Sequence, residues 1–546
     1  MTQASAPGTR GLLHDASTAN AGGVVASGTR SNPALTTPTD ARHWTLPRWF
    51  GAALLTVVAA GAMAPLADPD LPMHLAVGRW ILEHGAVPTT EPFAWTRPGA
   101  PYFAYSWLVQ SVMYLLMHAA GPIALRLLHG CLLASAFWSV LVAGRRIGWT
   151  RDTSCVVAAA HLVVFTSVSP LLRPQEALFM LLPLGWALVT RAIRADGSSK
   201  LAILIGLCLI AAITANTHVF FPLLAAPLSL ALTLPREAAE NSLRRRFRAG
   251  LPAAAALMVG VLCSPYTLDW VRVFELNFRA NALFGQSSLI AEHQSGFSTR
   301  LGLGVALAVL PLICSGTWTK RERVVWGAMW AMGLIAFALK AKGLLVWWFL
   351  AFPLVGLAAH RLLSASPAYR VIPPLLAFAV PLAAAYGFLV GVPPTIVPLA
   401  RAWRAENVVP GTTLSSPAAL ATDTLLVQLA ARAHGTRVLT VFDLGSYLTW
   451  RAPGLSASID GRTIFPDSAA LPDATLSPTA VTRPLGPWRS ANAAIVPLDY
   501  PVAAVLDTAS GWQRIAKTSA TSSPFGPVGL WLNRTVDDVS GRSRRK

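Results

Sequence analysis

Apolar runs long enough to cross a bilayer recur along most of this chain, from Trp49 to about Val397. A transmembrane helix needs about 17 to 25 mostly apolar residues. Helices are required there because lipid offers the backbone no hydrogen-bond partner. Only 13% of the 546 residues are charged, against about 25% in a typical soluble domain. We therefore expect an all-α polytopic membrane protein.

Basic clusters lie between the apolar runs and indicate the orientation. The formal charge is +19, but short groups of arginine between spans are what the positive-inside rule produces. We therefore expect membrane lipid, and no nucleic acid, as a partner. The clusters are Arg145, Arg146 and Arg151; Arg191, Arg194 and Lys200; Arg236 and residues 244–248; Lys320, Arg321 and Arg323; and Arg361.

Residues 105–144 decide how many times the chain crosses the membrane. This stretch is interrupted by Gly121 and Pro122 and has room for one crossing or two. With one crossing all the basic clusters share the cytoplasmic side, and about 11 helices result. The piece 106–118 then lies at the interface. The alternative splits 105–144 and merges 201–234. The predicted spans are 49–66, 122–143, 153–171, 175–193, 201–217, 219–234, 251–267, 300–316, 324–340, 343–361 and 372–396.

Composition divides the chain into three regions. Residues 1–45 are rich in Ser, Thr, Ala, Gly and Pro and predict a disordered cytoplasmic tail. Residues 46–399 form the transmembrane domain, with an external loop at 67–105. Residues 400–546 have no run long enough to span and predict a small α/β external (periplasmic) domain. Its expected elements are strands at 437–441, 493–496 and 502–506 and a helix at 417–434.

The loop after the first span carries the candidate catalytic residues Asp68, Asp70, His74 and Glu91. Ionisable groups beside a membrane are costly and therefore tend to be functional. Asp68 and Asp70 can share Mg²⁺ or Mn²⁺, or one of them can act as a general base; the alternative is a solvated turn. His74 follows on a short surface helix expected at 72–83, and Glu91 lies at a second proline-flanked turn.

Further polar residues fall on the same external side in the favoured topology. Arg173, Lys340 and Lys342 are candidates for binding a lipid phosphate through charge-assisted hydrogen bonds. The alternative is that these side chains only extend to the lipid head groups. Such external residues are candidates for substrate binding rather than decoration. The complete candidate set for substrate binding is Arg173, Gln175, Asn216, His218, Glu292, His293, Lys340 and Lys342.

Several short motifs resemble, in their order, those of bacterial GT-C-type integral membrane glycosyltransferases, and among these a largely uncharacterised group. They extend over most of residues 49–467, and the segment 442–462 is similar to that group's C-terminal domain. The matching residues are Asp68, Asp70 and His74; Pro88, Glu91, Pro92 and Phe93; Arg173, Pro174 and Gln175; Asn216 and His218; Ser264, Pro265 and Tyr266; and Glu292.

This resemblance implies a catalytic base or metal ligand at Asp68 and Asp70, and a polyprenyl-phosphate-linked sugar as donor. The chain departs from the group at residues 71–73, where aromatic residues are usual, and at His293, where Trp is expected. The expected function is sugar transfer to an acceptor at the outer face of a bacterial inner membrane. The alternatives are a transporter or flippase for a lipid-linked saccharide, against which the lack of a visible inverted repeat counts, and a non-catalytic scaffold.

Overall fold

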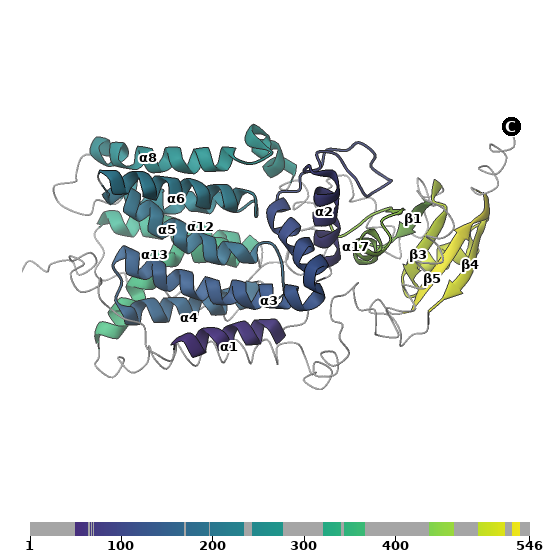
Figure 1. The fold of residues 1–546 in the computed structure, drawn as a ribbon, viewed down its shortest axis with the longest axis horizontal. Coiled ribbons are helices and arrows are strands. Elements are labelled where there is room, and N and C mark those ends of the chain that lie inside the picture. Colours follow the sequence, from purple (N-terminus) through teal and green to yellow (C-terminus); the bar gives the residue numbers. More distant parts are fainter. Residues whose placement is uncertain are drawn as a thin grey trace, which may run out of the picture. The chain divides into compact units, whose positions relative to one another are not determined.

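The computed structural model describes residues 50–63, 66, 68, 70–168, 171–195, 197–233, 243–276, 320–339, 343–365, 436–462, 490–518 and 527–535. Helices make up the first part of the chain, and a small mixed sheet forms the second (Figure 1). This arrangement confirms the mostly helical fold and the mixed C-terminal domain. The predicted spans 300–316 and 372–396, and the predicted helix 417–434, lie outside the described residues.

The bundle contains helices that are long and apolar enough to cross a membrane. Among the described residues these are α3, α5 and α6, and a bent pair beginning in α8 passes the same test if it counts as one span. The chain is thus an integral, multi-pass membrane protein, while the number of crossings stays a prediction. The helices are α1 Phe50–Met63, α2 Leu71–His84, α3 Trp107–Ile147, α4 Arg151–Val168, α5 Glu176–Arg194, α6 Ser198–Ala215, α7 Ala226–Thr233, α8 Leu243–Leu262, α12 Lys320–Leu339 and α13 Gly343–Ala365.

Helix α3 is broken where the sequence suggested an interruption. Gly121 has φ 68° and ψ −158°, which is not helical, and glycine reaches such a conformation without a Cβ clash. Pro122, which follows it, brings no N–H to the helix. The first half of α3 lies beside α2 and the second half runs within the bundle (Figure 1). The two halves therefore have different surroundings, and whether residues 105–144 cross the membrane once or twice stays a prediction.

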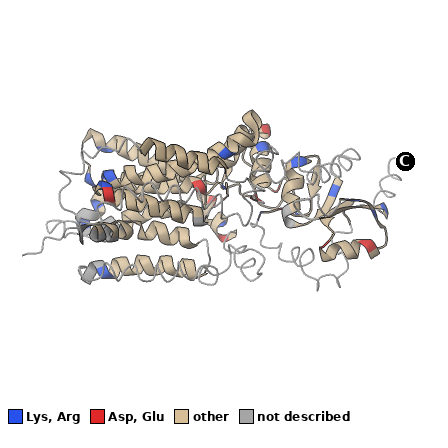
Figure 2. Cartoon of the chain, turned by 90° about the horizontal axis from the view of Figure 1, so that it is seen from below, with Lys and Arg blue, Asp and Glu red and all other residues tan. Residues whose placement is uncertain are grey.

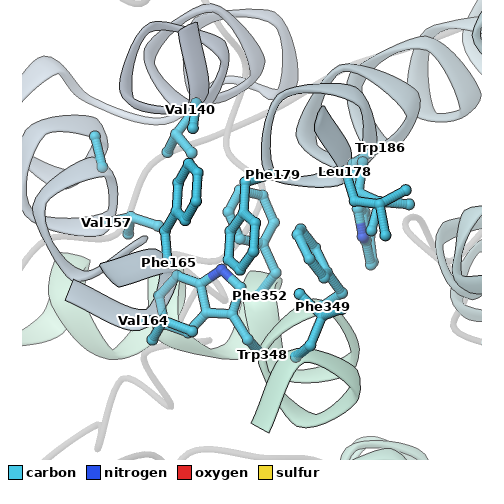
Figure 3. Packing of buried hydrophobic residues seen from close by; sticks show 14 of the residues in the cluster. Val140, Val157, Val164, Phe165, Leu178, Phe179, Trp186, Trp348, Phe349 and Phe352 are labelled. Carbon is cyan, nitrogen blue, oxygen red and sulfur yellow. The ribbon is translucent and has the colours of Figure 1, made fainter. Parts of the chain in front are cut away.

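Aromatic side chains fill the centre of the bundle. Phe165 of α4 stacks on Phe179 of α5 with ring centroids 4.3 Å apart, and Phe349 and Phe352 of α13 pack around them (Figure 3). Elsewhere, α1 and α3 approach so closely that a Cβ at Gly130 would lie 2.2 Å from the carbonyl oxygen of Val58. Such small-residue contacts let helices pack in lipid, where the hydrophobic effect does not drive them together.

Basic side chains mark one end of the bundle. The last turn of α3 carries Arg145 and Arg146, and the last turn of α5 carries Arg191 and Arg194. Figure 2 shows lysine and arginine gathered at that end of the helices. Asp68 and Arg173, in contrast, precede α2 and α5. The turn with Asp68 and Arg173 and these basic clusters therefore lie at opposite ends of α5.

The sheet has five strands in the order β2-β1-β3-β5-β4. Strand β1 pairs in parallel with β2 and β3, while β5 is antiparallel to β3 and β4. The elements are β1 Thr436–Thr440, α17 Phe442–Arg451, β2 Leu455–Ala457, β3 Ala493–Pro497, α19 Pro501–Thr508, β4 Trp512–Lys517 and β5 Val528–Asn533.

Two of the three strands predicted in this domain are confirmed, as β1 and β3. The strand predicted at 502–506 is wrong, because these residues lie in helix α19. Pro501 occupies the first turn, where a missing N–H costs nothing. Val502 and Leu506 are buried at helical spacing. A short apolar run is ambiguous between strand and helix, and the preceding proline was the deciding signal.

Candidate functional site

Asp68 and Asp70 are held in a tight turn at the start of α2. The backbone N–H of Asp70 donates to Asp68 Oδ1 over 2.8 Å, and the N–H of Leu71 donates to the carbonyl oxygen of Asp68 over 3.1 Å. An aspartate side chain often bonds the backbone two residues on in this way. Asp70 itself occupies the N-cap position, and Pro72 fits the first turn. The carboxylate of Asp68 is therefore fixed against the backbone at the start of α2.

Arg173, just before α5, joins the two carboxylates. Its Nε donates to Asp68 Oδ2, and its Nη2 lies 3.3 Å from Asp68 Oδ1 and 3.4 Å from Asp70 Oδ2. The side chain of Asp68 is 0% exposed, that of Arg173 13% and that of Asp70 30%. A planar guanidinium is suited to this two-point contact. The structure thus brings together three residues that the sequence predicted for one site.

The two carboxylates differ in what they can do. Both oxygens of Asp68 already accept hydrogen bonds from Arg173, and Oδ1 accepts another from Asp70. Asp70 is the more exposed of the two. A carboxylate that is fully engaged orients its partner, while one with access to solvent can accept a proton or bind a ligand. Asp68 therefore suits an anchoring role, and Asp70 suits chemistry.

His74 lies one helical turn after Asp70. Its backbone N–H donates to the carbonyl oxygen of Asp70 over 3.0 Å. Its Nδ1 shares a 3.0 Å hydrogen bond with Nε2 of Gln110 on α3. Helices α2 and α3 are so close here that a Cβ at Gly78 would lie 2.1 Å from the carbonyl oxygen of Gln110. His74 therefore helps fix α2, and with it Asp70, against α3.

Tyr105 is a site neighbour that sequence reasoning missed. Its ring meets the ring of His218 edge to face, with centroids 5.6 Å apart. Burial raises the pKa of Tyr105 to about 12; the charge of Asp70 also raises it, and that of Arg173 lowers it. Tyr105 therefore lies within electrostatic reach of both charged groups and links them to His218. The residue stands in an aromatic-rich stretch, and no motif singled it out.

Asn216 connects three parts of the bundle by hydrogen bonds. Its Oδ1 accepts from Trp107 Nε1 over 2.6 Å, and its Nδ2 donates to the carbonyl oxygens of Ala212 and Cys263 over 2.8 and 3.2 Å. These bonds join the end of α6 to the start of α3 and to the segment after α8. Gln175 is buried immediately before α5. Substrate binding by Asn216, His218 and Gln175 stays a prediction.

Glu91 lies in a separate buried cluster with residues of the sheet domain. Its Oε1 accepts from the N–H groups of Phe93 and Ala94 and from Arg462 Nη2, the last over 2.6 Å. Arg462 also pairs with Asp460. Burial lowers the pKa of Arg462, but the charges of Asp460 and Glu91 outweigh burial and raise it well above its ordinary value. Glu91 thus meets an arginine that was not among the predicted site residues, and catalysis by Glu91 stays a prediction.

The loop between α2 and α3 is bound to the sheet domain at further points. The N–H of Trp95 donates to the carbonyl oxygen of Ala457 over 3.1 Å, and Thr96 Oγ1 donates to that of Ser458 over 2.6 Å. Arg79 of α2 donates to two carbonyls in the last turn of α17, those of Thr449 and Trp450, over 2.8 and 2.9 Å. A cation at a helix C-terminus meets the negative end of the helix dipole. Loop and sheet are therefore held together by several independent contacts.

A second buried polar pair lies inside the bundle. His129 Nδ1 of α3 is 2.8 Å from Glu176 Oε2 at the start of α5, and both side chains are almost fully buried. Glu176 follows the Arg173-Pro174-Gln175 turn, and its N–H donates to the carbonyl oxygen of Arg173 over 3.1 Å. Sequence reasoning missed this pair. The signal was an acidic residue in the first turn of a membrane-length helix, where buried charges are rare and paired.

The residues present do not make a clear metal site. In the described part of the chain no three His, Cys, Asp or Glu side chains form a group that could hold an ion. Asp68 and Asp70 both face Arg173, whose positive charge compensates theirs. A Mg²⁺ or Mn²⁺ site at Asp68 and Asp70 stays a prediction. Glu292, His293, Lys340 and Lys342 lie outside the described residues.

Together these features define a multi-pass membrane protein whose acidic and basic groups meet beside a small mixed-sheet domain. No family model and no curated protein matches the chain by sequence. Its structure is similar to several solved structures. One of them is ArnT from Cupriavidus metallidurans, with 14% identity, a TM-score of 0.47, and 89% of this chain and 98% of ArnT covered.

Another similar structure is the oligosaccharyltransferase of Archaeoglobus fulgidus. The identity is 10%, the TM-score is 0.47, and 76% of this chain is covered. The match spans 65% of the archaeal protein's own length.

Proposed function

We propose that this protein is a membrane glycosyltransferase. It moves a sugar from a polyprenyl-phosphate-linked donor to an acceptor hydroxyl at the outer face of a bacterial inner membrane. The observation that carries the proposal is the pairing of Asp70 with Arg173: a partly exposed carboxylate 3.4 Å from a largely buried guanidinium. The first is a base for an acceptor, and the second is a cation for a phosphate. The order of the sequence motifs adds independent support.

Asp70 is the proposed general base. The acceptor oxygen attacks the anomeric carbon while its proton passes to a carboxylate oxygen of Asp70. The bond between the anomeric carbon and the phosphate oxygen breaks, and its electron pair leaves with the polyprenyl phosphate. The products are the glycosylated acceptor and polyprenyl phosphate, and Asp70 then returns its proton to water. A single displacement of this kind inverts the configuration at the anomeric carbon.

Arg173 is the proposed phosphate-binding residue. Negative charge grows on the phosphate as the sugar leaves, and a fixed cation stabilises that charge without reorganising. Asp68 holds the guanidinium in place by contacting it with both oxygens. Tyr105 stays protonated at neutral pH, since its pKa is about 12, and it can therefore donate a hydrogen bond near Asp70.

The decisive experiment measures transfer by the full-length protein in lipid nanodiscs. The donors are polyprenyl phosphates carrying radiolabelled glucose, mannose or arabinose, and the acceptors are extracted cell-envelope lipids and glycans. Asp70→Asn should lower transfer about 100-fold or more, which is the usual contribution of a general base. Its binding of polyprenyl phosphate should stay close to that of the wild type. The matched control is Asp499→Asn, at an exposed aspartate of the sheet domain.

Two results would overturn the proposal. The first is normal transfer by Asp70→Asn. The second is movement of a labelled polyprenyl-phosphate sugar across liposome bilayers by the wild-type protein without any transfer to an acceptor. That second result would identify a flippase, which needs the cation but no base.

A further inference from the structure

One short segment of the sheet domain, Asp460–Gly461–Arg462, contacts two acidic residues of the loop at 67–105, namely Asp70 and Glu91. Arg462 and Asp460 form the buried cluster with Glu91. Gly461, between these two residues in the sequence, lies so close to Asp70 that a Cβ at this glycine would be 2.7 Å from Asp70 Oδ1. The proposed base therefore borders on the sheet domain as well as on Arg173.

Gly461 leaves no room for a side chain. The same hypothetical Cβ would also lie 2.7 Å from Ser446 Oγ of α17, an atom that accepts a 2.8 Å hydrogen bond from the N–H of Gly461. Real Cβ atoms do not approach other atoms so closely. Both crowding atoms are the ends of side chains rather than backbone. An alanine here would consequently displace the Asp70 carboxylate or the Ser446 hydroxyl, while the backbone stays in place.

Arg462 fixes the segment firmly in the loop. Its guanidinium contacts Asp460 and Glu91, and it stands over the rings of Phe93 and Tyr102, with its Cζ 5.0 and 4.7 Å from their centroids. Paired charges and ring faces on several sides leave the side chain little freedom. The cluster therefore sets where Gly461 lies, and Gly461 in turn limits where the Asp70 carboxylate can lie.

We infer that the Asp460–Gly461–Arg462 segment is a positioning element for Asp70, and that Glu91 is a positioning residue which acts through Arg462. The inference rests on the proposed function, since it assigns the segment to the same base. It makes the sheet domain part of the catalytic geometry, in addition to any contact it has with an acceptor. A general base that is displaced by about 1 Å or less accelerates the reaction much less.

The test compares Gly461→Ala with Asp70→Asn in the nanodisc transfer assay. Gly461→Ala should lower kcat about tenfold or more with an unchanged KM for the polyprenyl-phosphate sugar, because the base moves while the phosphate contact remains. Adding Ser446→Ala opens space on the other side of the new methyl group and should restore part of kcat. The matched control is Gly327→Ala on α12, where a Cβ would meet nothing within 4 Å; its kcat should equal that of the wild type.

Glu91→Gln provides a second route to the answer should Gly461→Ala fail to fold. It keeps the acceptor for the N–H groups of Phe93 and Ala94 but removes the charge facing Arg462, and kcat should again fall with KM unchanged. Wild-type kcat in both Gly461→Ala and Glu91→Gln, or a change in KM alone, would overturn the inference. If Asp70→Asn is inactive in that same experiment, the proposed function survives. Normal transfer by Asp70→Asn would instead reject the proposed function itself.

Discussion

The guanidinium of Arg173 contacts both carboxylate oxygens of Asp68, a residue 105 positions earlier in the chain. Asp68 is fully buried, and Arg173 is nearly so. A buried ion pair of this kind adds little net stability, yet removing one partner is costly because the other charge is left uncompensated. The contact therefore ties the turn before α2 to the turn before α5 and fixes the direction in which Arg173 points.

Asp68→Asn is expected to destabilise the protein, whereas Asp70→Asn is not. The asparagine keeps an acceptor for the N–H of Asp70 but leaves the charge of Arg173 poorly compensated, a loss of about 3 to 5 kcal/mol for a broken buried pair. Thermal unfolding in detergent would show a lower Tm for Asp68→Asn and a nearly unchanged Tm for Asp70→Asn. Equal Tm values for the two variants would contradict the division of roles between the carboxylates.

Arg173→Lys should weaken donor binding without unfolding the protein. Lysine keeps the positive charge but cannot contact two carboxylates and a phosphate with one planar group. The KM for a polyprenyl-phosphate sugar should rise about tenfold, which corresponds to the loss of about one charge-assisted hydrogen bond. Arg146→Lys, at the opposite end of the bundle, serves as the control and should leave KM unaltered. An unchanged KM in Arg173→Lys would remove the phosphate-binding role.

Stability should fall at high pH because of Tyr105. Burial, with a further contribution from Asp70, raises the pKa of this residue from 10.0 to about 12 in the folded protein. Between these values the folded state holds a proton that the unfolded chain has lost, so each such group lowers stability by about 1.4 kcal/mol per pH unit. Tm should be flat from pH 8 to 10 and fall from 10 to 12.

Tyr105→Phe should make that decline shallower. It should not abolish the decline, because burial raises the pKa of Tyr102 as well. Identical Tm profiles for the wild type and Tyr105→Phe would show that Tyr105 titrates normally in the folded protein.

The one-crossing topology can be tested by cysteine labelling. In a background without the native cysteines, Arg146→Cys at the end of α3 and Asp499→Cys in the sheet domain each offer one exposed thiol. A membrane-impermeant maleimide added to intact cells should label position 499 only. Labelling at 146 from outside would favour two crossings within residues 105–144.

The sequence predicted the main elements because long apolar runs and basic clusters are local signals. It also predicted the grouping of Asp68, Asp70 and Arg173, because the favoured topology placed all of them at the same face. The interruption at Gly121 was readable as well, since a helix usually ends at or before the residue that precedes a proline. These features need only the identity of neighbouring residues and the alternation of spans.

Other features depend on contacts that no local pattern encodes. Glu91 lies 371 positions from its partner Arg462, and a sequence offers no means of pairing a buried carboxylate with one arginine among many. Tyr105 was missed for the same reason, because its role follows from the charges that surround it. The run at 502–506 is a different case, because Pro501 before it was a local sign of a helix start that the strand assignment did not use.

The bridge between Ala94 and Ala457 has a practical consequence for work on the C-terminal region. Strand β2 is an outer strand of the sheet, and this loop backbone runs alongside it. An isolated fragment starting at residue 400 would expose that strand, and exposed outer strands promote aggregation. A well-behaved soluble fragment should therefore require residues 86–104 to be fused to it, even though 295 residues, 105–399, separate the two segments in the sequence.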